Sequence, residues 1–122
     1  MTQPSEKPVA LITGASSGIG EGVARRFAAG GWRVVIVARR QERLAQLERA
    51  LSELTQVASV AVDVTAKDAP ERAVGAAMQA FGRLDCLVNN AGSGKWAPVG
   101  DTDDATLDEI IDTSLKAPVR FA

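Results

Sequence analysis

The sequence predicts an α/β protein with a doubly wound parallel sheet, four strands in the order 3-2-1-4, and helices on both faces. Short apolar runs rich in β-branched residues alternate strictly with helical patterns along the chain, and such alternation is typical of parallel sheets. A glycine-rich turn, Thr13–Gly20, joins the first apolar run to a helical pattern. Right-handed crossovers and a reversal after the third strand then give this strand order, which is the Rossmann-type arrangement.

Three elements are expected in the first third of the chain. The apolar run Val9–Ile12 predicts a buried strand over residues 8–13. A helix follows over residues 18–29, and Gly30-Gly31 ends it. The β-branched run over residues 33–38 is bounded by glycine and by charges, and it predicts the second strand.

The middle of the chain predicts one helix and one strand. Residues 41–54 carry leucines at helical spacing, which favours an amphipathic helix on the core over a zipper, because two heptads are too few for a coiled coil. These leucines are Leu44, Leu47, Leu51 and Leu54. Alternating residues over 57–62 predict the third strand, which runs into a loop at Asp63-Val64-Thr65.

Two helices and a strand are expected in the remainder. Asp68 is expected to cap a helix that runs to Phe81, with Glu71 as its capping-box partner. Gly82-Arg83 ends that helix, and residues 84–88 predict the fourth strand. A last helix is expected to begin at Thr102 or Asp104 and to present one apolar face, made of Leu107, Ile110, Ile111 and Leu115.

The composition indicates one small globular domain over residues 1–122, with 46% hydrophobic and 24% charged residues. A net charge of -1 offers no basic field for nucleic acid or anionic lipid. No apolar run could span a bilayer, and residues 1–8 lack the apolar centre of a signal peptide. The single Cys86 excludes an internal disulfide and fits a reducing compartment, so we expect a cytoplasmic protein. Histidine is absent, and we expect no metal site.

The glycine turn predicts dinucleotide binding. Glycines let the backbone approach the oxygens of a diphosphate without Cβ clashes, and the following helix start offers free N–H groups and partial positive charge. The alternative is a turn that merely connects a strand to a helix. Three glycines within Gly14–Gly20 argue against that alternative.

Three motifs, each at the end of an expected strand, resemble those of the short-chain dehydrogenase/reductase family. Thr13–Gly20 matches its TGxxxGIG turn, Asp63-Val64 matches its adenine-contacting pair, and Asn89–Gly92 matches its NNAG segment. The resemblance covers the chain from about residue 7 to its end. It implies a cofactor site at the carboxyl ends of the strands, where the winding of the sheet reverses.

The resemblance also implies roles for single residues. Backbone groups from Ser16 to Ile19 would hold the diphosphate, Gly14 would allow the tight turn, and Gly20 would let the helix pack close to the sheet. The implied cofactor-binding residues are Gly14, Ser16, Ser17, Gly18, Ile19 and Gly20 in the turn, Asp63 and Val64 after the third strand, and Asn90, Ala91 and Gly92 after the fourth.

The end of the second strand predicts which form of the cofactor binds. An NAD-selective site usually places a carboxylate there for the ribose 2′-hydroxyl, whereas this chain has Ala38 followed by Arg39 and Arg40. Guanidinium groups attract a 2′-phosphate and bind it bidentately. We therefore expect NADP(H) in preference to NAD(H), with Arg39 as the main clamp and Arg40 or Ser16 assisting. The alternative is that the two arginines form a solvated helix start.

The resemblance implies hydride transfer between the nicotinamide and a small alcohol or carbonyl substrate. The family uses a Ser and a Tyr-x-x-x-Lys motif for the accompanying proton transfer, and an Asn on the fourth helix supports a water relay. This chain has no tyrosine, and the Asn position falls on Ser114. Ser114 is alternatively a helix residue bonded to its own backbone.

Two functions follow from these residues. The first is an NADP(H)-dependent oxidoreductase of the short-chain type, present as its cofactor-binding half and inactive by itself. The second is a non-catalytic nucleotide-binding module or a degenerate remnant. The chain ends at Ala122 inside a helical pattern, so we expect a domain truncated after the fourth helix. An open strand edge would then require a homo-oligomer or the missing half.

Overall fold

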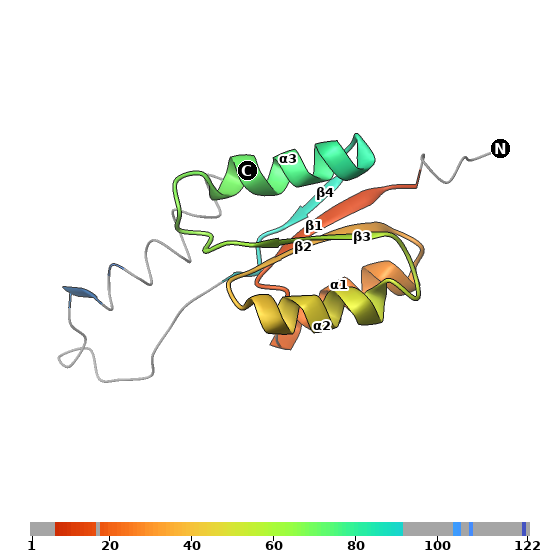
Figure 1. Ribbon diagram of the computed structural model, residues 1–122, viewed down its shortest axis with the longest axis horizontal. Helices are drawn as coiled ribbons and strands as arrows, with labels where there is room; N and C mark the ends of the chain where they lie inside the picture. Colours follow the sequence, from red (N-terminus) through yellow and green to blue (C-terminus); the bar gives the residue numbers. More distant parts are fainter. Residues whose placement is uncertain (1–6, 17, 92–103, 106–107, 109–120, 122) are drawn as a thin grey trace.

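The computed structural model describes residues 7–16, 18–91, 104–105, 108 and 121. Seven elements alternate along the chain, and Figure 1 shows how they are layered. The strands are β1 (Val9–Thr13), β2 (Arg33–Ala38), β3 (Val57–Ala61) and β4 (Cys86–Val88); the helices are α1 (Gly18–Ala29), α2 (Gln41–Leu51) and α3 (Ala69–Phe81).

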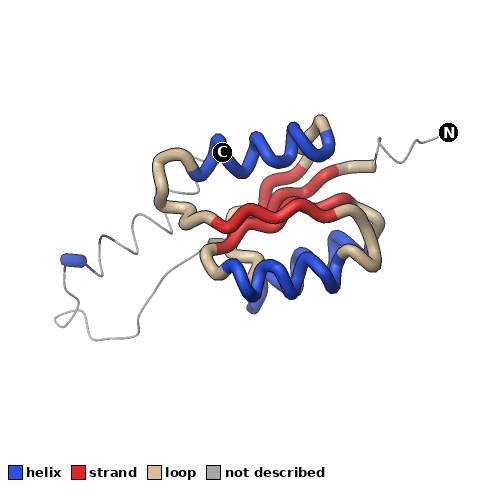
Figure 2. Tube along the Cα trace, viewed as in Figure 1, coloured by secondary structure: helices blue, strands red, loops and turns tan. Residues whose placement is uncertain are grey.

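The strands form one parallel sheet in the order β3-β2-β1-β4, as the sequence predicts. The reversal of winding lies between β1 and β4, which are adjacent although far apart in the sequence. Figure 2 shows α1 and α2 on one face of the sheet and α3 on the other. All strand carboxyl ends therefore share one edge, and the candidate site lies there.

Two apolar clusters fill the space between the sheet and its helices. Because successive strand residues point to opposite faces, Val9 and Leu11 pack toward α3, whereas Ala10 and Ile12 pack toward α1 and α2. The strands and the segment after β3 supply mostly valines to the cluster on the α3 side, whereas α3 supplies small alanines, and Phe121 is also buried there. Leu44, Leu47 and Leu51 supply the larger side chains under α2.

The predicted end of the second helix is wrong by three residues. α2 ends at Leu51, which is fully buried, whereas Leu54 is 57% exposed. The Ser52 hydroxyl donates a hydrogen bond to the carbonyl of Glu48 at 2.6 Å, and the N–H groups of Leu54 and Thr55 bond to the Leu51 carbonyl in a turn. This turn directs the chain toward Val57, the first residue of β3, which pairs with Val34 of β2.

The predicted capping box at Asp68 is also wrong. Asp68 precedes α3, but its side chain makes no capping hydrogen bond and its ψ of 2° is not the extended conformation of a capping residue. The Ala69 N–H bonds instead to the Ala66 carbonyl, and Pro70 in the first turn has no N–H to satisfy.

The remaining boundaries agree closely with the predictions. Gly82, with a φ of 73°, ends α3, and its N–H bonds to the carbonyls of Ala77 and Met78. β4 is shorter than the predicted strand and begins at Cys86. The expected last helix falls largely outside the described residues. Within the described part of the chain, no helix has the length and hydropathy needed to cross a membrane.

Candidate functional site

The Thr13 hydroxyl ties the ends of β1 and β4 together. Its oxygen accepts hydrogen bonds from the N–H groups of Asn90 and Ala91, each at 3.0 Å, and its hydrogen is donated to the Val88 carbonyl at 3.4 Å. Thr13 is 1% exposed, so these bonds form away from water. They hold the segment after β4 directly against the glycine turn after β1.

A second set of contacts fixes the turn itself. The Asn90 side-chain amide donates to the Gly14 carbonyl at 3.3 Å. A Cβ on Gly14, whose φ is +63°, would lie 2.8 Å from the Cα of Ala91, and a Cβ on Gly20 would lie 2.1 Å from the Gly14 carbonyl oxygen. Both glycines are thus required for the close approach of the turn, the start of α1 and Asn90.

Gly18 and Ile19 face the open side of the turn. Gly18 has a φ of +59°, and a Cβ placed on it would meet nothing within 4 Å. Ile19 is 78% exposed, which is unusual for a large apolar side chain. An open glycine backbone at a helix start is the geometry that accepts a diphosphate. The turn therefore fits the group that its sequence predicts.

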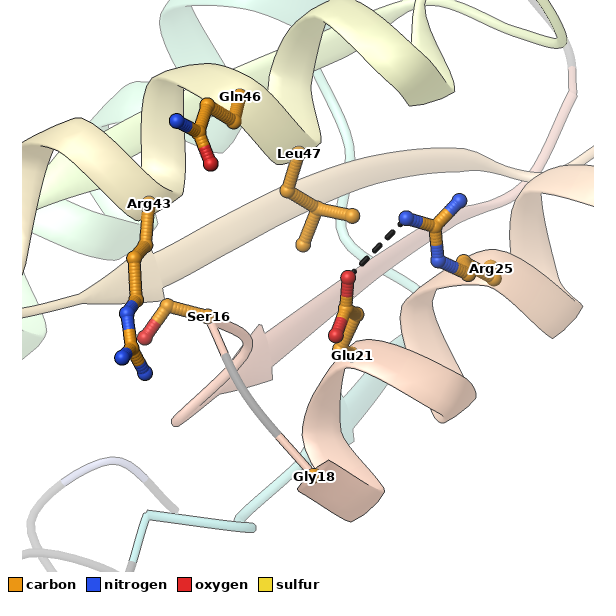
Figure 3. Close-up of a pocket in the computed structure, with 7 residues that line it drawn as sticks. All are labelled: Ser16, Gly18, Glu21, Arg25, Arg43, Gln46 and Leu47. Carbon is orange, nitrogen blue, oxygen red and sulfur yellow. Dashed lines mark hydrogen bonds and ion pairs between the residues drawn. The ribbon is translucent and has the colours of Figure 1, made fainter.

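A cavity of about 320 Å³ adjoins this turn, between α1 and α2. Figure 3 shows its walls: the turn lies on one side, the Glu21–Arg25 ion pair of α1 on another, and α2 above them. The side chains and backbone that line it include Ser16, Gly18, Glu21, Arg25, Arg43 and Leu47.

The predicted arginines lie at the end of β2, beside the residues that follow β3. Ala38 is buried, while Arg39 and Arg40 are exposed. A guanidinium nitrogen of Arg39 lies 3.8 Å from a carboxylate oxygen of Asp63. Both side chains are largely exposed, so this pair is weak and Arg39 is free to turn toward a ligand.

Asp63 is held in place by its own loop. Partial burial raises its pKa, but hydrogen bonds from the N–H and hydroxyl of Thr65, at 2.9 and 2.8 Å, and the Arg39 charge outweigh burial and lower the pKa overall. The neighbouring Val64 points into the core and is 5% exposed, which leaves only its backbone for a ligand.

The fold brings Gly14, Gly20, Asn90 and Ala91 into direct contact, and it places Arg39 beside Asp63. Ser17, Gly92 and Ser114 lie outside the described residues. Sequence reasoning missed the anchoring role of Thr13 and the place of Arg43 in the cavity wall. The signal for Arg43 was its spacing, since it lies one helical turn before the buried Leu47.

The chain is similar in sequence to known proteins. A family model described as short chain dehydrogenase matches residues 8–122. Sulfoacetaldehyde reductase 2 of Chromohalobacter salexigens is 40% identical over 113 residues, which cover 92% of this chain and 45% of that protein.

Solved structures show the same likeness. L-sorbose reductase from Gluconobacter frateurii, complexed with NADPH and L-sorbose, has a TM-score of 0.88 at 38% identity and covers 95% of this chain. An alcohol dehydrogenase from Thermococcus sibiricus, complexed with 5-hydroxy-NADP, has a TM-score of 0.90 at 31% identity and also covers 95% of this chain. The match spans 45% and 50% of those two chains, so this chain is about half as long as its relatives. On sequence and structure alike, it belongs to the short-chain dehydrogenase family.

Proposed function

We propose that this chain binds NADP(H) in preference to NAD(H), and that residues 1–122 form the dinucleotide-binding domain of an oxidoreductase acting on a small alcohol or carbonyl compound. Relatives that include a sulfoacetaldehyde reductase, and solved structures that contain NADPH and NADP, support this class of reaction. A cytoplasmic location and a homo-oligomeric assembly are part of the proposal.

The observation that carries the cofactor preference is the chemistry at the end of β2. The buried Ala38 offers no carboxylate to a ribose hydroxyl, and the exposed guanidinium groups of Arg39 and Arg40 come next. An acid there would repel a 2′-phosphate, whereas arginine attracts it and matches its oxygens bidentately. In this proposal Arg39 leaves its weak pair with Asp63 to take the phosphate.

The diphosphate is assigned to the open side of the glycine turn. Backbone groups of Ser16, Ser17, Gly18 and Ile19 would meet its oxygens, and the exposed Ile19 side chain would pack against the bound cofactor. Asp63 and Val64 are assigned to the adenine. Asn90, Ala91 and Gly92 are also assigned to cofactor binding, and the Thr13 hydroxyl accepts hydrogen bonds from the N–H groups of the first two.

The bound cofactor would supply or accept the hydride, while this chain's own residues bind and orient it. The sequence contains neither tyrosine nor histidine, so we expect the 122-residue chain alone not to reduce ketones. The same observation favours a second candidate, a non-catalytic nucleotide-binding module. Reading the gene beyond Ala122 separates the two, because the oxidoreductase requires a downstream Ser and a Tyr-x-x-x-Lys segment.

Calorimetric titration of the 122-residue chain with NADPH and with NADH tests the proposal. We expect NADPH to bind at least about tenfold more tightly, which corresponds to roughly 1.4 kcal/mol from the 2′-phosphate contacts. Arg39→Ala should remove most of that difference and leave NADH binding nearly unchanged. Equal affinity of the wild-type chain for the two dinucleotides would show the cofactor assignment to be wrong.

A further inference from the structure

Arg43 lines the cavity beside the glycine turn. It lies on α2, in the cavity wall that also includes the buried Leu47. Figure 3 shows its side chain leaving α2 toward Ser16, which belongs to the turn and lines the same cavity. A flexible cation thus reaches from one element toward a hydroxyl on another.

The charges in this cavity leave Arg43 available for an anion. Glu21 and Arg25 satisfy each other at 3.0 Å along α1. Among the ion pairs formed by the described residues, none includes Arg43. The lining therefore carries one uncompensated positive charge on α2, next to the Ser16 side chain.

Arg39 directly follows β2, and Arg43 lies four residues later, in the first turn of α2. Arg39 is turned toward β3, where Asp63 lies 3.8 Å away. Arg43 lines the cavity on the side of α1 and the turn. Of these two arginines, only Arg39 forms an ion pair within the described part of the chain.

We infer that Arg43, with the Ser16 hydroxyl, is the second cationic contact of the adenosine 2′-phosphate and a determinant of cofactor specificity. The inference rests on the proposed function, because it assigns a further residue to the same site. A phosphate monoester carries between one and two negative charges at neutral pH and offers three acceptor oxygens. Arg39 can take one edge of such a group, which leaves oxygens for a bidentate contact from Arg43 and a hydrogen bond from Ser16.

The test compares two small probes that differ only in the 2′-phosphate: adenosine 2′,5′-bisphosphate and adenosine 5′-monophosphate. Both are titrated calorimetrically into the 122-residue chain and its variants. Arg43→Gln should weaken binding of the bisphosphate about tenfold and change binding of the monophosphate by less than about twofold. The affinity of Arg43→Lys for the bisphosphate should lie between those of the wild type and Arg43→Gln, because lysine keeps the positive charge but cannot make the bidentate hydrogen bonds of a guanidinium.

Arg49→Gln is the matched control. Arg49 is exposed in the last turn of the same helix, so this variant loses the same charge outside the cavity. It should leave both affinities within about twofold of wild type. If Arg49→Gln and Arg43→Gln weakened binding of the bisphosphate equally, the loss would come from the change in net charge and not from a direct contact of Arg43, and the inference would be wrong.

The outcomes for Arg43 and for the proposed function are separable. If the wild-type chain prefers the bisphosphate and Arg43→Gln retains that preference within about twofold, the role of Arg43 is wrong and the proposed function stands. If the wild-type chain does not distinguish the probes, or binds neither, the proposed function itself fails. Both variants are at exposed positions, and thermal melting checks that their folds are intact.

Discussion

Single residues at the carboxyl edge decide whether the glycine turn can exist in its observed shape. Gly20 is the tightest case, because its missing side chain lets the Gly14 carbonyl and the Asn90 amide approach the start of α1. The three residues come from the ends of β1 and β4 and from the first turn of α1, so one added methyl group would disturb all three.

We predict that Gly20→Ala destabilises the chain by about 1–3 kcal/mol and abolishes measurable binding of NADPH, because a Cβ would lie 2.1 Å from the Gly14 oxygen. Gly22→Ala is the matched control in the same helix, where a Cβ meets nothing within 4 Å. It should stabilise the chain by up to about 1 kcal/mol. Urea unfolding measures both, and equal stability of the two variants would contradict the prediction.

Asp85 stabilises the start of β1, at the end of the sheet opposite the glycine turn. Its carboxylate accepts a hydrogen bond from the Val9 N–H at 2.8 Å and two from the Arg83 guanidinium at 2.8 and 2.6 Å. The hydrogen bonds from Arg83, then that from Val9, and the charges of Arg83 and Arg33 lower the pKa of Asp85. The carboxylate thus holds the beginning of β1 more strongly when it is ionised.

A pH dependence follows with a definite sign. Because the folded-state pKa of Asp85 lies below the unfolded value of about 3.9, its contribution to stability is present above that value and is lost as the pH falls through the folded pKa. Asp85→Asn should therefore lower the free energy of unfolding at pH 7, and its difference from wild type should shrink below about pH 4.

Urea unfolding at several pH values between 3 and 7 measures this difference. Asp68→Asn is the comparison, since the Asp68 side chain makes no capping hydrogen bond, and it should change little. A difference between Asp85→Asn and wild type that is as large at pH 3 as at pH 7 would rule out the ionic contribution.

Among the elements, α2 shows that leucines at helical spacing are not all buried. The leucine pattern predicts a helix to residue 54, but the structure buries Leu44, Leu47 and Leu51 and exposes Leu54 in the turn that follows. The helical period says which residues share a face; it does not say where the helix ends. Here the chain turns after Leu51, whose carbonyl accepts hydrogen bonds from the N–H groups of Leu54 and Thr55, and it then enters β3.

We predict that Leu51→Ala lowers the free energy of unfolding by about 2–5 kcal/mol, because it removes a fully buried side chain and leaves a cavity under α2. Leu54→Ala removes the same atoms at a position that is 57% exposed and should cost no more than about 0.5 kcal/mol. Chemical denaturation distinguishes the two. Comparable losses would mean that Leu54 packs on the core.

For the molecule as a whole, β4 is one of the two edge strands of the described sheet; β3 is the other. β4 pairs with β1 on one side, and its residues are only half-buried. An edge strand presents N–H and C=O groups that another strand can pair with. The same arrangement that places Asn90 and Ala91 at the end of β4 thus leaves one side of β4 without a partner strand among the described residues.

We predict that the 122-residue chain self-associates at micromolar concentrations instead of remaining a stable monomer. Sedimentation velocity over a tenfold concentration range should show the weight-average mass rising with concentration, as mass action requires. A single monomeric species throughout, with a cooperative thermal transition, would refute this.

The sequence by itself determined the alternation of elements, the parallel sheet order and the family. Each rests on patterns within a few residues: β-branched runs, helical periodicity, and the motifs at Thr13–Gly20 and Asn89–Gly92. Local patterns of this kind are set by backbone sterics and by burial of one face, so they can be read without coordinates. The capping box at Asp68 is absent because the backbone of Asp68, with a ψ of 2°, is not extended as a capping residue requires, and its side chain makes no capping hydrogen bond.

The contacts between side chains at the carboxyl edge could not be predicted from the sequence and depend on the packing of the folded chain. The Thr13 hydroxyl meets N–H groups 77 and 78 residues away, Arg39 turns toward Asp63, and Arg43 lines a cavity with Ser16. These contacts depend on the order of the strands and on how far each helix is rotated on the sheet. Those quantities are set by packing across the whole core, and no short stretch of sequence specifies them.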